Sequence, residues 1–400
     1  MDGQGVYLCK TRKLPMVFEH GHEHYYVVWE TSCPSNGSSL EWWVDDESNG
    51  SRHFVKAQYK MIDKSHHRYS VIIGPVGLAS EVHYRAISHN KPIAQHSITR
   101  RSKDEQTRIL VIADNQNGPT EFRRVLTSIQ NHYDKSNSVP DAILHVGDSV
   151  QNVGKLGDWQ NQLFSPLEDG GGYHHGSPIV FVPGNHDHDK SRTPNNGNFY
   201  TDMYHGILTT DGLGESAVVN GSYHRFFHIA SLGSARIIVL DCECPSAEQL
   251  EFLEQELQSE AFQSARFRIV AVHIPPYIEF WDPYAWNEKG EKHWGEHVRL
   301  EYDPLFRRHN VDLVISGHQH NYQRATVQRD VQSADSGSIT YAIVGGAGGD
   351  LDLVRVENWN MYNVTYLDHH FVSLEVDDQQ LRWQAKDKAG RIVDQFSFFG

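Results

Sequence analysis

The sequence predicts a mixed α/β (α+β) protein in which a small N-terminal β-sandwich precedes a larger domain of β-sheet flanked by helices. Two observations lead to this fold class. The first hundred of the 400 residues contain short aromatic or β-branched segments separated by Gly, Ser, Asn and Pro, and from about residue 101 continuous apolar runs alternate with amphipathic helical segments. Because the chain is longer than one typical domain, we expect two domains, at residues 1–95 and 104–400, with a polar linker near residues 88–104.

The predicted strands of the first hundred residues are not interrupted by any long segment of helical period. Short strands at regular spacing, with turn residues between them, are typical of a β-sandwich. We therefore expect a sandwich of the immunoglobulin or fibronectin type. Its predicted strands are residues 24–30, 40–44, 53–59, 69–73 and 81–86.

The predicted strands of the second domain are mostly apolar runs, and helical segments alternate with them. Continuous apolar strands are typical of sheets that helices cover. The predicted strands are residues 108–113, 142–146, 178–183, 235–241, 267–273, 312–316, 341–344, 371–376 and 381–385, and the predicted helices are residues 119–132 and 246–260.

The charge balance argues against two classes of partner. The chain has 36 Lys plus Arg against 51 Asp plus Glu, and a net charge of −15, whereas nucleic-acid polymers and anionic membranes bind clustered basic residues. No window holds the roughly 20 apolar residues that a membrane helix needs. We expect neither a nucleic-acid polymer as a partner nor a membrane span.

The compartment stays open, because two features disagree. The first residues lack the apolar core of a signal peptide, which predicts a cytoplasmic chain as the sequence is written, whereas four Asn-X-Ser/Thr sequons favour secretion. The sequons are at Asn36, Asn49, Asn220 and Asn363.

The cysteines are too few and too scattered for a disulfide framework. We expect reduced thiols. The cysteines are Cys9, Cys33, Cys242 and Cys244.

Potential metal ligands directly follow five of the predicted strands. Because the carboxyl ends of strands form the ligand crevice of an open α/β sheet, these side chains should meet. Carboxylates, amide oxygens and imidazoles suit metals such as Mn, Fe and Zn, and these ligands are more than one tetrahedral ion uses. Two ions about 3.5–4 Å apart can clamp the oxygens of a phosphoryl transfer, so we expect a two-metal site. The polar blocks are Asp114–Gln116, Gly147–Asp148, Gly184–Asp187, His273 and Gly317–His320.

These blocks resemble, in order, the five-block pattern of calcineurin-like metallophosphoesterases. The stretch Val311–Arg324 is similar to the purple acid phosphatase branch in particular, whose last block continues to a Tyr and an Arg. That branch also carries an N-terminal fibronectin-like sandwich. The resemblance covers most of the chain and implies a phosphoric-ester hydrolase.

The resemblance also implies a role for each site residue. Asp148 would bridge two metal ions, and a metal-bound hydroxide would attack phosphorus. His186 would face the substrate as general acid or phosphoryl clamp. His188 and Arg324 are further candidates for substrate binding, with a solvated loop position and a structural ion pair as their respective alternatives. The implied ligand sets are Asp114, Asp148 and His320 for the first ion, and Asp148, Asn185, His273 and His318 for the second.

Two positions depart from the family pattern. Gln151 stands where purple acid phosphatases have the tyrosine that ligates ferric iron, and Gln116 stands where other metallophosphoesterases have a histidine. A glutamine carbonyl is a weaker ligand than tyrosinate or imidazole. We therefore expect a protein that is not purple and that holds a divalent first ion loosely, with ligation by Gln116 left open.

Three functions follow as hypotheses. The first is a phosphomonoesterase of the acid-phosphatase type, with a phosphate ester as its partner. The second is a phosphodiesterase acting on nucleotides or phospholipid head groups, because the same metal cage serves both reactions. The third is a binding or scaffold protein with a degraded first metal site. The oligomeric state is left open.

Overall fold

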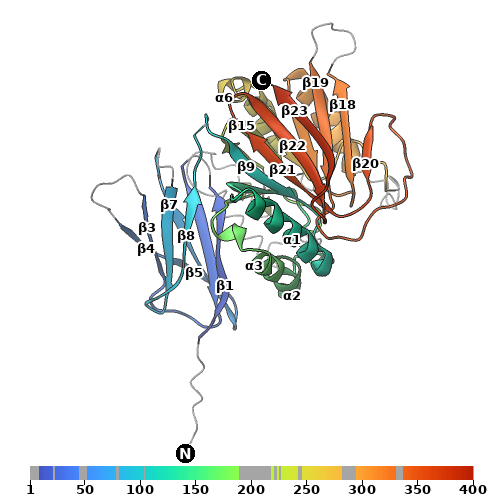
Figure 1. Ribbon diagram of the computed structural model, residues 1–400. Coiled ribbons are helices and arrows are strands. Elements are labelled where there is room, and N and C mark those ends of the chain that lie inside the picture. The colour runs from blue at the N-terminus through green and yellow to red at the C-terminus, as the bar shows by residue number, and fades with distance from the viewer. Residues whose placement is uncertain are drawn as a thin grey trace, which may run out of the picture. The chain divides into compact units, whose positions relative to one another are not determined.

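The computed structural model describes residues 9–20, 23–44, 52–77, 81–102, 104–188, 227–241, 246–281, 294–329 and 337–399, together with the strand residues 218–219 and 223–224. The chain divides into two compact units, residues 1–100 with 174–178, and residues 101–173 with 179–400 (Figure 1). Four of the residues named above lie outside the described residues: Asn49, Asn220, Cys242 and Cys244.

The described part of residues 1–100 is β-rich, as predicted. Its strands form two antiparallel runs, in the orders β1-β2-β6-β5 and β4-β3-β7-β8. Burial alternates along β7, so that Val82, Tyr84 and Ala86 point into the core with Trp29 and Val71, as expected for strands with one solvated face. The strands are β1 (Thr11–Glu19), β2 (Tyr25–Thr31), β3 (Ser39–Val44), β4 (His53–Lys56), β5 (Gln58–Asp63), β6 (His66–Ile73), β7 (Glu81–Ser88) and β8 (Lys91–Thr99).

The linker predicted at residues 88–104 is wrong over most of its length, because β8 occupies Lys91–Thr99 and pairs with β7. Most residues of β8 are exposed or half-buried, and Ile98 is the one that enters the core. A strand with so few buried positions carries little apolar signal. Strand β1 was not predicted either, because its first residues are the polar Thr11, Arg12 and Lys13.

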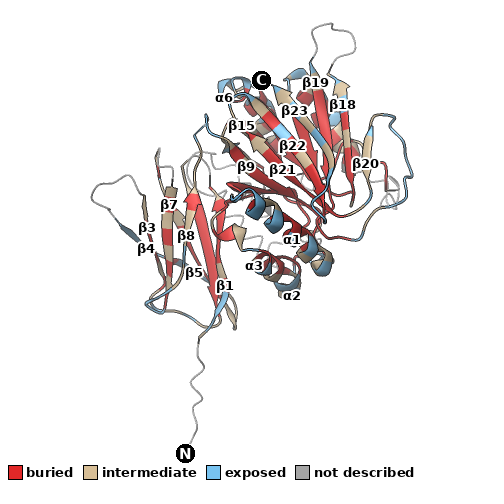
Figure 2. Cartoon of the chain, in the orientation of Figure 1, coloured by how far each residue is buried: buried red, intermediate tan, exposed pale blue. Residues whose placement is uncertain are grey.

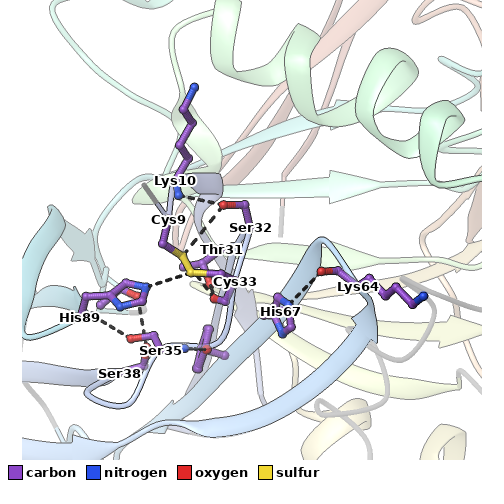
Figure 3. The surroundings of a disulfide bond; sticks show 12 residues. Cys9, Lys10, Thr31, Ser32, Cys33, Ser35, Ser38, Lys64, His67 and His89 are labelled. Carbon is purple, nitrogen blue, oxygen red and sulfur yellow. Dashed lines mark hydrogen bonds between the residues drawn. A yellow bond between two sulfur atoms is a disulfide. The ribbon is translucent and has the colours of Figure 1, made fainter. Parts of the chain in front are cut away.

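A disulfide joins Cys9 to Cys33 (Figure 3). Thr11 and Thr31 are partners in the β1–β2 hairpin, so the segments before β1 and after β2 run side by side and bring the two Cα atoms to 5.4 Å. The expectation of reduced thiols is therefore wrong for this pair. It failed because β1, which creates the pairing, was not predicted.

The second unit contains two sheets that face each other. One runs in the order β23-β22-β21-β9-β10-β11, and the other in the order β14-β15-β16-β17-β19-β18-β20. In the first sheet, β10 is parallel to both of its neighbours β9 and β11. In the second sheet, parallel pairing runs from β15 to β16, from β16 to β17 and from β17 to β19. The strands are β9 (Thr107–Ile112), β10 (Ala142–His145), β11 (Ile179–Phe181), β12 (Val218–Val219), β13 (Tyr223–His224), β14 (His228–Leu232), β15 (Ala235–Leu240), β16 (Phe267–Val272), β17 (Leu313–Ser316), β18 (Tyr322–Gln328), β19 (Ser338–Val344), β20 (Val364–Tyr366), β21 (His370–Val376), β22 (Gln380–Asp387) and β23 (Ile392–Phe399).

Alternation along the strands builds a helix–sheet–sheet–helix arrangement. On β15, Ile237 and Val239 join the core between the sheets, whereas Ile238 and Leu240 pack under helices. The buried faces of the strands and the exposed outer face of α1 are visible in Figure 2. The helical elements are α1 (Pro119–Lys135), α2 (Leu156–Asp158), η1 (Trp159–Phe164), α3 (Ser165–Asp169), η2 (Tyr173–His175), α5 (Ala247–Gln258), α6 (Glu260–Gln263), α7 (Trp294–His297), η4 (Val298–Tyr302) and α8 (Asp303–Arg308).

The predicted helices at 119–132 and 246–260 and the mixed α/β fold class are confirmed. Ser246 caps α5 by accepting a hydrogen bond from the Gln249 backbone amide, which is the usual role of serine at that position. Among the described residues, we find no helix with the length and apolar character to cross a membrane.

Candidate metal centre

The predicted metal ligands converge where strand ends of both sheets of the second unit meet. Asp114 and Asp148 follow β9 and β10 of one sheet, and His273 and His318 follow β16 and β17 of the other. The ligands were expected at the edge of one sheet. They come instead from two facing sheets, each of which contributes residues at the carboxyl ends of its strands.

Three of these ligands have a left-handed backbone conformation that non-glycine residues rarely adopt. The φ angles are 59° at Asp114, 54° at Asp148 and 68° at His318. Such residues cost about 1–3 kcal/mol each and concentrate at functional sites. The turns aim the ligand side chains back across the strand ends.

Glycines beside the ligands allow this close packing. Gly147 has a φ of 92°, and a Cβ atom on it would lie 2.5 Å from His273 Nδ1. A Cβ atom on Gly184 would collide with Asp148, and one on Gly317 with Asp114. A methyl group at any of the three would displace a ligand.

The second-ion ligands form a compact, buried set. Asn185 Oδ1 lies 3.2 Å from His273 Nε2 and 3.0 Å from His318 Nδ1. His273 Nε2 lies 3.4 Å from Asp148 Oδ2, and ligand atoms of Asp148, His273 and His318 lie within 4.8 Å of one another. All four side chains are buried. A mixed oxygen and nitrogen set of this size fits a divalent Mn, Fe or Zn ion.

The first-ion ligands are arranged around Gln116. His320 Nε2 lies 3.6 Å from Asp114 Oδ1, and Gln116 Nε2 lies 3.1 Å from both Asp148 Oδ2 and His320 Nε2. Gln116 Oε1 is buried with no hydrogen-bond partner among the described residues. Rotating the amide by half a turn points this oxygen at the same ligands. The residues therefore fit a first ion with Gln116 as a neutral oxygen donor.

Neighbouring groups orient the ligand side chains. His273 Nδ1 lies 2.7 Å from the Val146 carbonyl, so its Nε2 lone pair faces the centre. The His318 backbone amide donates to both carboxylate oxygens of Asp114 at 3.0 Å. His320 Nδ1 faces the Asp350 carbonyl at 2.5 Å. Such contacts fix which ring nitrogen is free to bind a metal.

The buried charges influence one another strongly. Burial raises the pKa of Asp114 to about 7. His273 and His320 act in the opposite direction and lower it, whereas the nearby Asp148 charge raises it further. Burial opposes the charged form of His273, but the negative charges of Asp148 and Asp114 outweigh it and raise its pKa to about 10. Burial also opposes ionisation of Asp148, whose pKa is nevertheless held below its usual range by His273. Clustered carboxylates at one point favour the binding of cations.

Asp187 completes the third block, although the sequence analysis gave it no role. Its Oδ2 accepts the backbone amides of Asp148 at 2.7 Å and Gly184 at 2.9 Å, and its Oδ1 accepts that of Ser149 at 3.0 Å. Asp187 thereby ties the second block to the third. Its place beside Asn185 and His186 was the available signal.

His186 lies beside the ligands, as the resemblance implies. Its backbone amide donates to Asp148 Oδ1 at 2.8 Å, and its Nδ1 lies 3.0 Å from the Gln151 carbonyl. The side chain is half-buried. Gln151 therefore contributes its backbone to the site, and its own side chain is exposed.

The two further candidates for substrate binding have different surroundings. His188 Nε2 lies 3.1 Å from Asp241 Oδ1 at the end of β15. Arg324 forms a two-point ion pair with Asp394, at 2.5 and 3.0 Å. The structural alternative for Arg324 is the one the structure shows, and we leave Arg324 out of the substrate site.

Trp281 and Asp352 also contact the centre. The Trp281 ring lies 4.7 Å from the His318 ring, and its Nε1 donates to Asp352 Oδ2 at 2.7 Å. The same oxygen accepts the His320 backbone amide at 2.8 Å. Asp352 follows the glycine-rich loop at 345–349, which packs on Asp114 and His320.

The sequence model of the calcineurin-like phosphoesterase family matches residues 107–322, more than half of the chain. The chain belongs to this family.

Within the family, the chain is similar to purple acid phosphatases. It is 25% identical to probable inactive purple acid phosphatase 24 of Arabidopsis thaliana, over 64% of this chain and 43% of that protein. It is 26% identical to purple acid phosphatase 1 of Ipomoea batatas, over 48% of this chain and 39% of that protein. The aligned part thus spans less than half the length of these relatives.

Solved structures show the same fold. Purple acid phosphatase PPD1 from yellow lupin (Lupinus luteus) seeds superposes with a TM-score of 0.76 at 16% identity, over 96% of this chain and 74% of that one. A structure of PhoD superposes with a TM-score of 0.63 at 12% identity, over 96% of this chain and 89% of that one. The predicted resemblance to purple acid phosphatases is confirmed.

Proposed function

We propose that this protein hydrolyses phosphate monoesters with two divalent metal ions. The observation that carries the proposal is the convergence of the predicted ligands beside a half-buried histidine. Asp148, Asn185, His273 and His318 would hold the second ion, and Asp114, Asp148, His320 and Gln116 the first. When bound, such ions polarise phosphoryl oxygens and lower the pKa of water.

The residues of the chain have separate tasks in this proposal. Asp148 lies between both ligand sets, since its Oδ2 faces both His273 and Gln116. The contact between His186 Nδ1 and the Gln151 carbonyl leaves Nε2 to hold or donate a proton at the ester. A general acid of this kind contributes about 10²–10⁴-fold to rate.

The test compares two substrates on Mn-loaded protein: p-nitrophenyl phosphate and bis(p-nitrophenyl) phosphate. We expect faster cleavage of the monoester, and loss of that activity in the Asp148→Asn variant. Faster cleavage of the diester would contradict the monoesterase proposal and favour nucleotide or lipid diesters. No activity above the variant on either ester would remove both.

A second candidate function is a binding or scaffold role with an incomplete first metal site. Gln116 and Gln151 favour it, because each replaces a stronger ligand of the family pattern. A relative being named probable inactive also bears on it. Metal stoichiometry separates the candidates: two ions per chain at saturating Mn²⁺ support the enzyme, and one or none supports the scaffold.

We also propose that the protein resides in an extracytoplasmic compartment. Because disulfides persist in oxidising environments, the Cys9–Cys33 bridge favours an extracytoplasmic site. The sequon residues Asn36 and Asn363 are exposed, which agrees with that location. Glycosidase treatment of the protein from its natural source should increase its electrophoretic mobility; unchanged mobility would argue against glycosylation at these sites.

A further inference from the structure

The fourth parallel strand of the second unit ends in an acidic residue to which the metal-binding scheme assigns no task. Asp241 directly follows β15 and is fully buried. Leu240 is the register partner of Val272 on β16, so Asp241 and His273 stand at equivalent positions on neighbouring strands. Adjacent strands are about 4.8 Å apart. Asp241 therefore lies at the edge of the metal centre.

The Asp241 carboxylate faces a histidine from the block that supplies Asn185 and His186. His188 Nε2 lies 3.1 Å from Asp241 Oδ1, and 14% of the His188 side chain is exposed against 0% of the Asp241 side chain. A carboxylate held against one ring nitrogen fixes the orientation of an imidazole and directs its other nitrogen elsewhere. In this pair the histidine is the less buried partner.

The backbone of Asp241 is held by a side chain of α5. The Asp241 amide donates to Gln249 Oε1 at 2.7 Å, and Gln249 Nε2 donates to the Asp241 carbonyl at 2.7 Å. Gln249 Nε2 also donates to the Tyr302 hydroxyl at 2.8 Å. This support is built on rigid elements, as sites that need accurate positioning usually are.

We propose that Asp241 is a positioning residue that holds His188 at the rim of the metal centre, where His188 binds the phosphoryl group of the substrate. The proposal rests on the proposed function, because it adds a substrate contact to the same site. Nε2 is directed to Asp241, so Nδ1 is the atom that contacts a phosphoryl oxygen. His186 and His188 then approach the ester from two points of one loop.

The experiment measures binding of inorganic phosphate to Mn-loaded protein by titration calorimetry, beside KM and kcat for p-nitrophenyl phosphate. The variants are His188→Ala, Asp241→Asn and their double variant. The matched control is Asp141→Asn, since Asp141 is also buried and accepts from Arg101 and the Arg108 amide, but precedes β10 at its other end. Thermal unfolding and metal content check that each variant is folded and loaded.

We expect each single variant to weaken phosphate binding at least tenfold, and KM to rise more than kcat falls. The double variant should be no more than about threefold weaker than the weaker single variant, because both act through one contact. Three results would overturn the inference. They are a loss of phosphate affinity below tenfold in the single variants, a loss in the double variant equal to the product of the two single losses, and a loss in Asp141→Asn as large as in the test variants. If no ester is cleaved but phosphate binding shows this coupling, the inference stands while the proposed function fails. If esters are cleaved but the variants bind phosphate as the wild type does, the reverse holds.

Discussion

Replacing Gln116 by histidine should tighten binding of metal at the first-ion site. This is the weaker of the two sites, so it takes up the second equivalent of added metal. Gln116 Nε2 lies 3.1 Å from Asp148 Oδ2 and from His320 Nε2, which are two ligand atoms of the first site. Before the Gln116 amide can rotate and offer its oxygen to a first ion, both contacts must break, one worth about 1.5–3 kcal/mol because it involves a charge and one worth about 1 kcal/mol. Together they weaken the site by about 2.5–4 kcal/mol, or roughly 60- to 700-fold.

An imidazole at position 116 removes this competition and supplies a nitrogen ligand. We expect Gln116→His to bind the second equivalent of Mn²⁺ at least tenfold more tightly than the wild type, with the first equivalent unchanged. Competition with a chromogenic chelator measures both constants, and Gln116→Ala is the control that removes the amide without adding a ligand. An unchanged or weaker second equivalent in Gln116→His would refute this account of the first site.

Three further predictions concern stability. Cys33→Ser should lower the free energy of unfolding by about 3 kcal/mol. The reason is that the bridge to Cys9 closes a loop across a sequence separation of 24. An unchanged denaturation midpoint would argue against the bridge. Arg324→Ala should destabilise the protein, because it removes the ionic partner of the mostly buried Asp394 carboxylate and leaves the Tyr322 hydroxyl as its remaining side-chain donor among the described residues. The affinity for phosphate should stay at the wild-type value; weaker phosphate binding would return Arg324 to the substrate site. Burial lowers the pKa of His370 from 6.5 to about 4, so the unfolded state binds its proton first and stability falls by about 3 kcal/mol as pH drops from 6.5 to 4. His370→Gln should flatten this part of the stability–pH curve, and an identical slope in both proteins would show that other groups cause it.

The convergence of the candidate metal ligands was predictable because chemistry and local structure agree in the sequence. Asp114, Asp148 and His273 each follow an apolar run directly, and parallel strands bring such positions to one edge. Their individual roles came from the resemblance to the family. The same reasoning found β9, β10 and β16, whose residues are almost all buried.

The missed features depend on partners far along the chain. Asp241 is the last residue of a predicted strand, but its partner His188 is 53 residues away in the sequence. No sequence pattern links the two positions. Asp352 binds the His320 amide from a loop without a recognisable pattern. The disulfide required the pairing of β1 with β2, and β1 begins with polar residues. Each of these features depends on a tertiary contact, which local sequence propensity does not predict.

The two glutamines affect one half of the centre and leave the other half intact. Of the two glutamines, Gln116 contacts the first-ion ligands through its side chain. Gln151 contacts His186 through its backbone carbonyl. The lack of a side-chain ligand at position 151 therefore leaves in place the backbone carbonyl that contacts His186. A site degraded by drift would be expected to lose the strained backbone at Asp114, Asp148 and His318, because that strain costs stability without a bound ion to offset it. Its retention favours a centre that still binds metal, with the second ion held more tightly than the first.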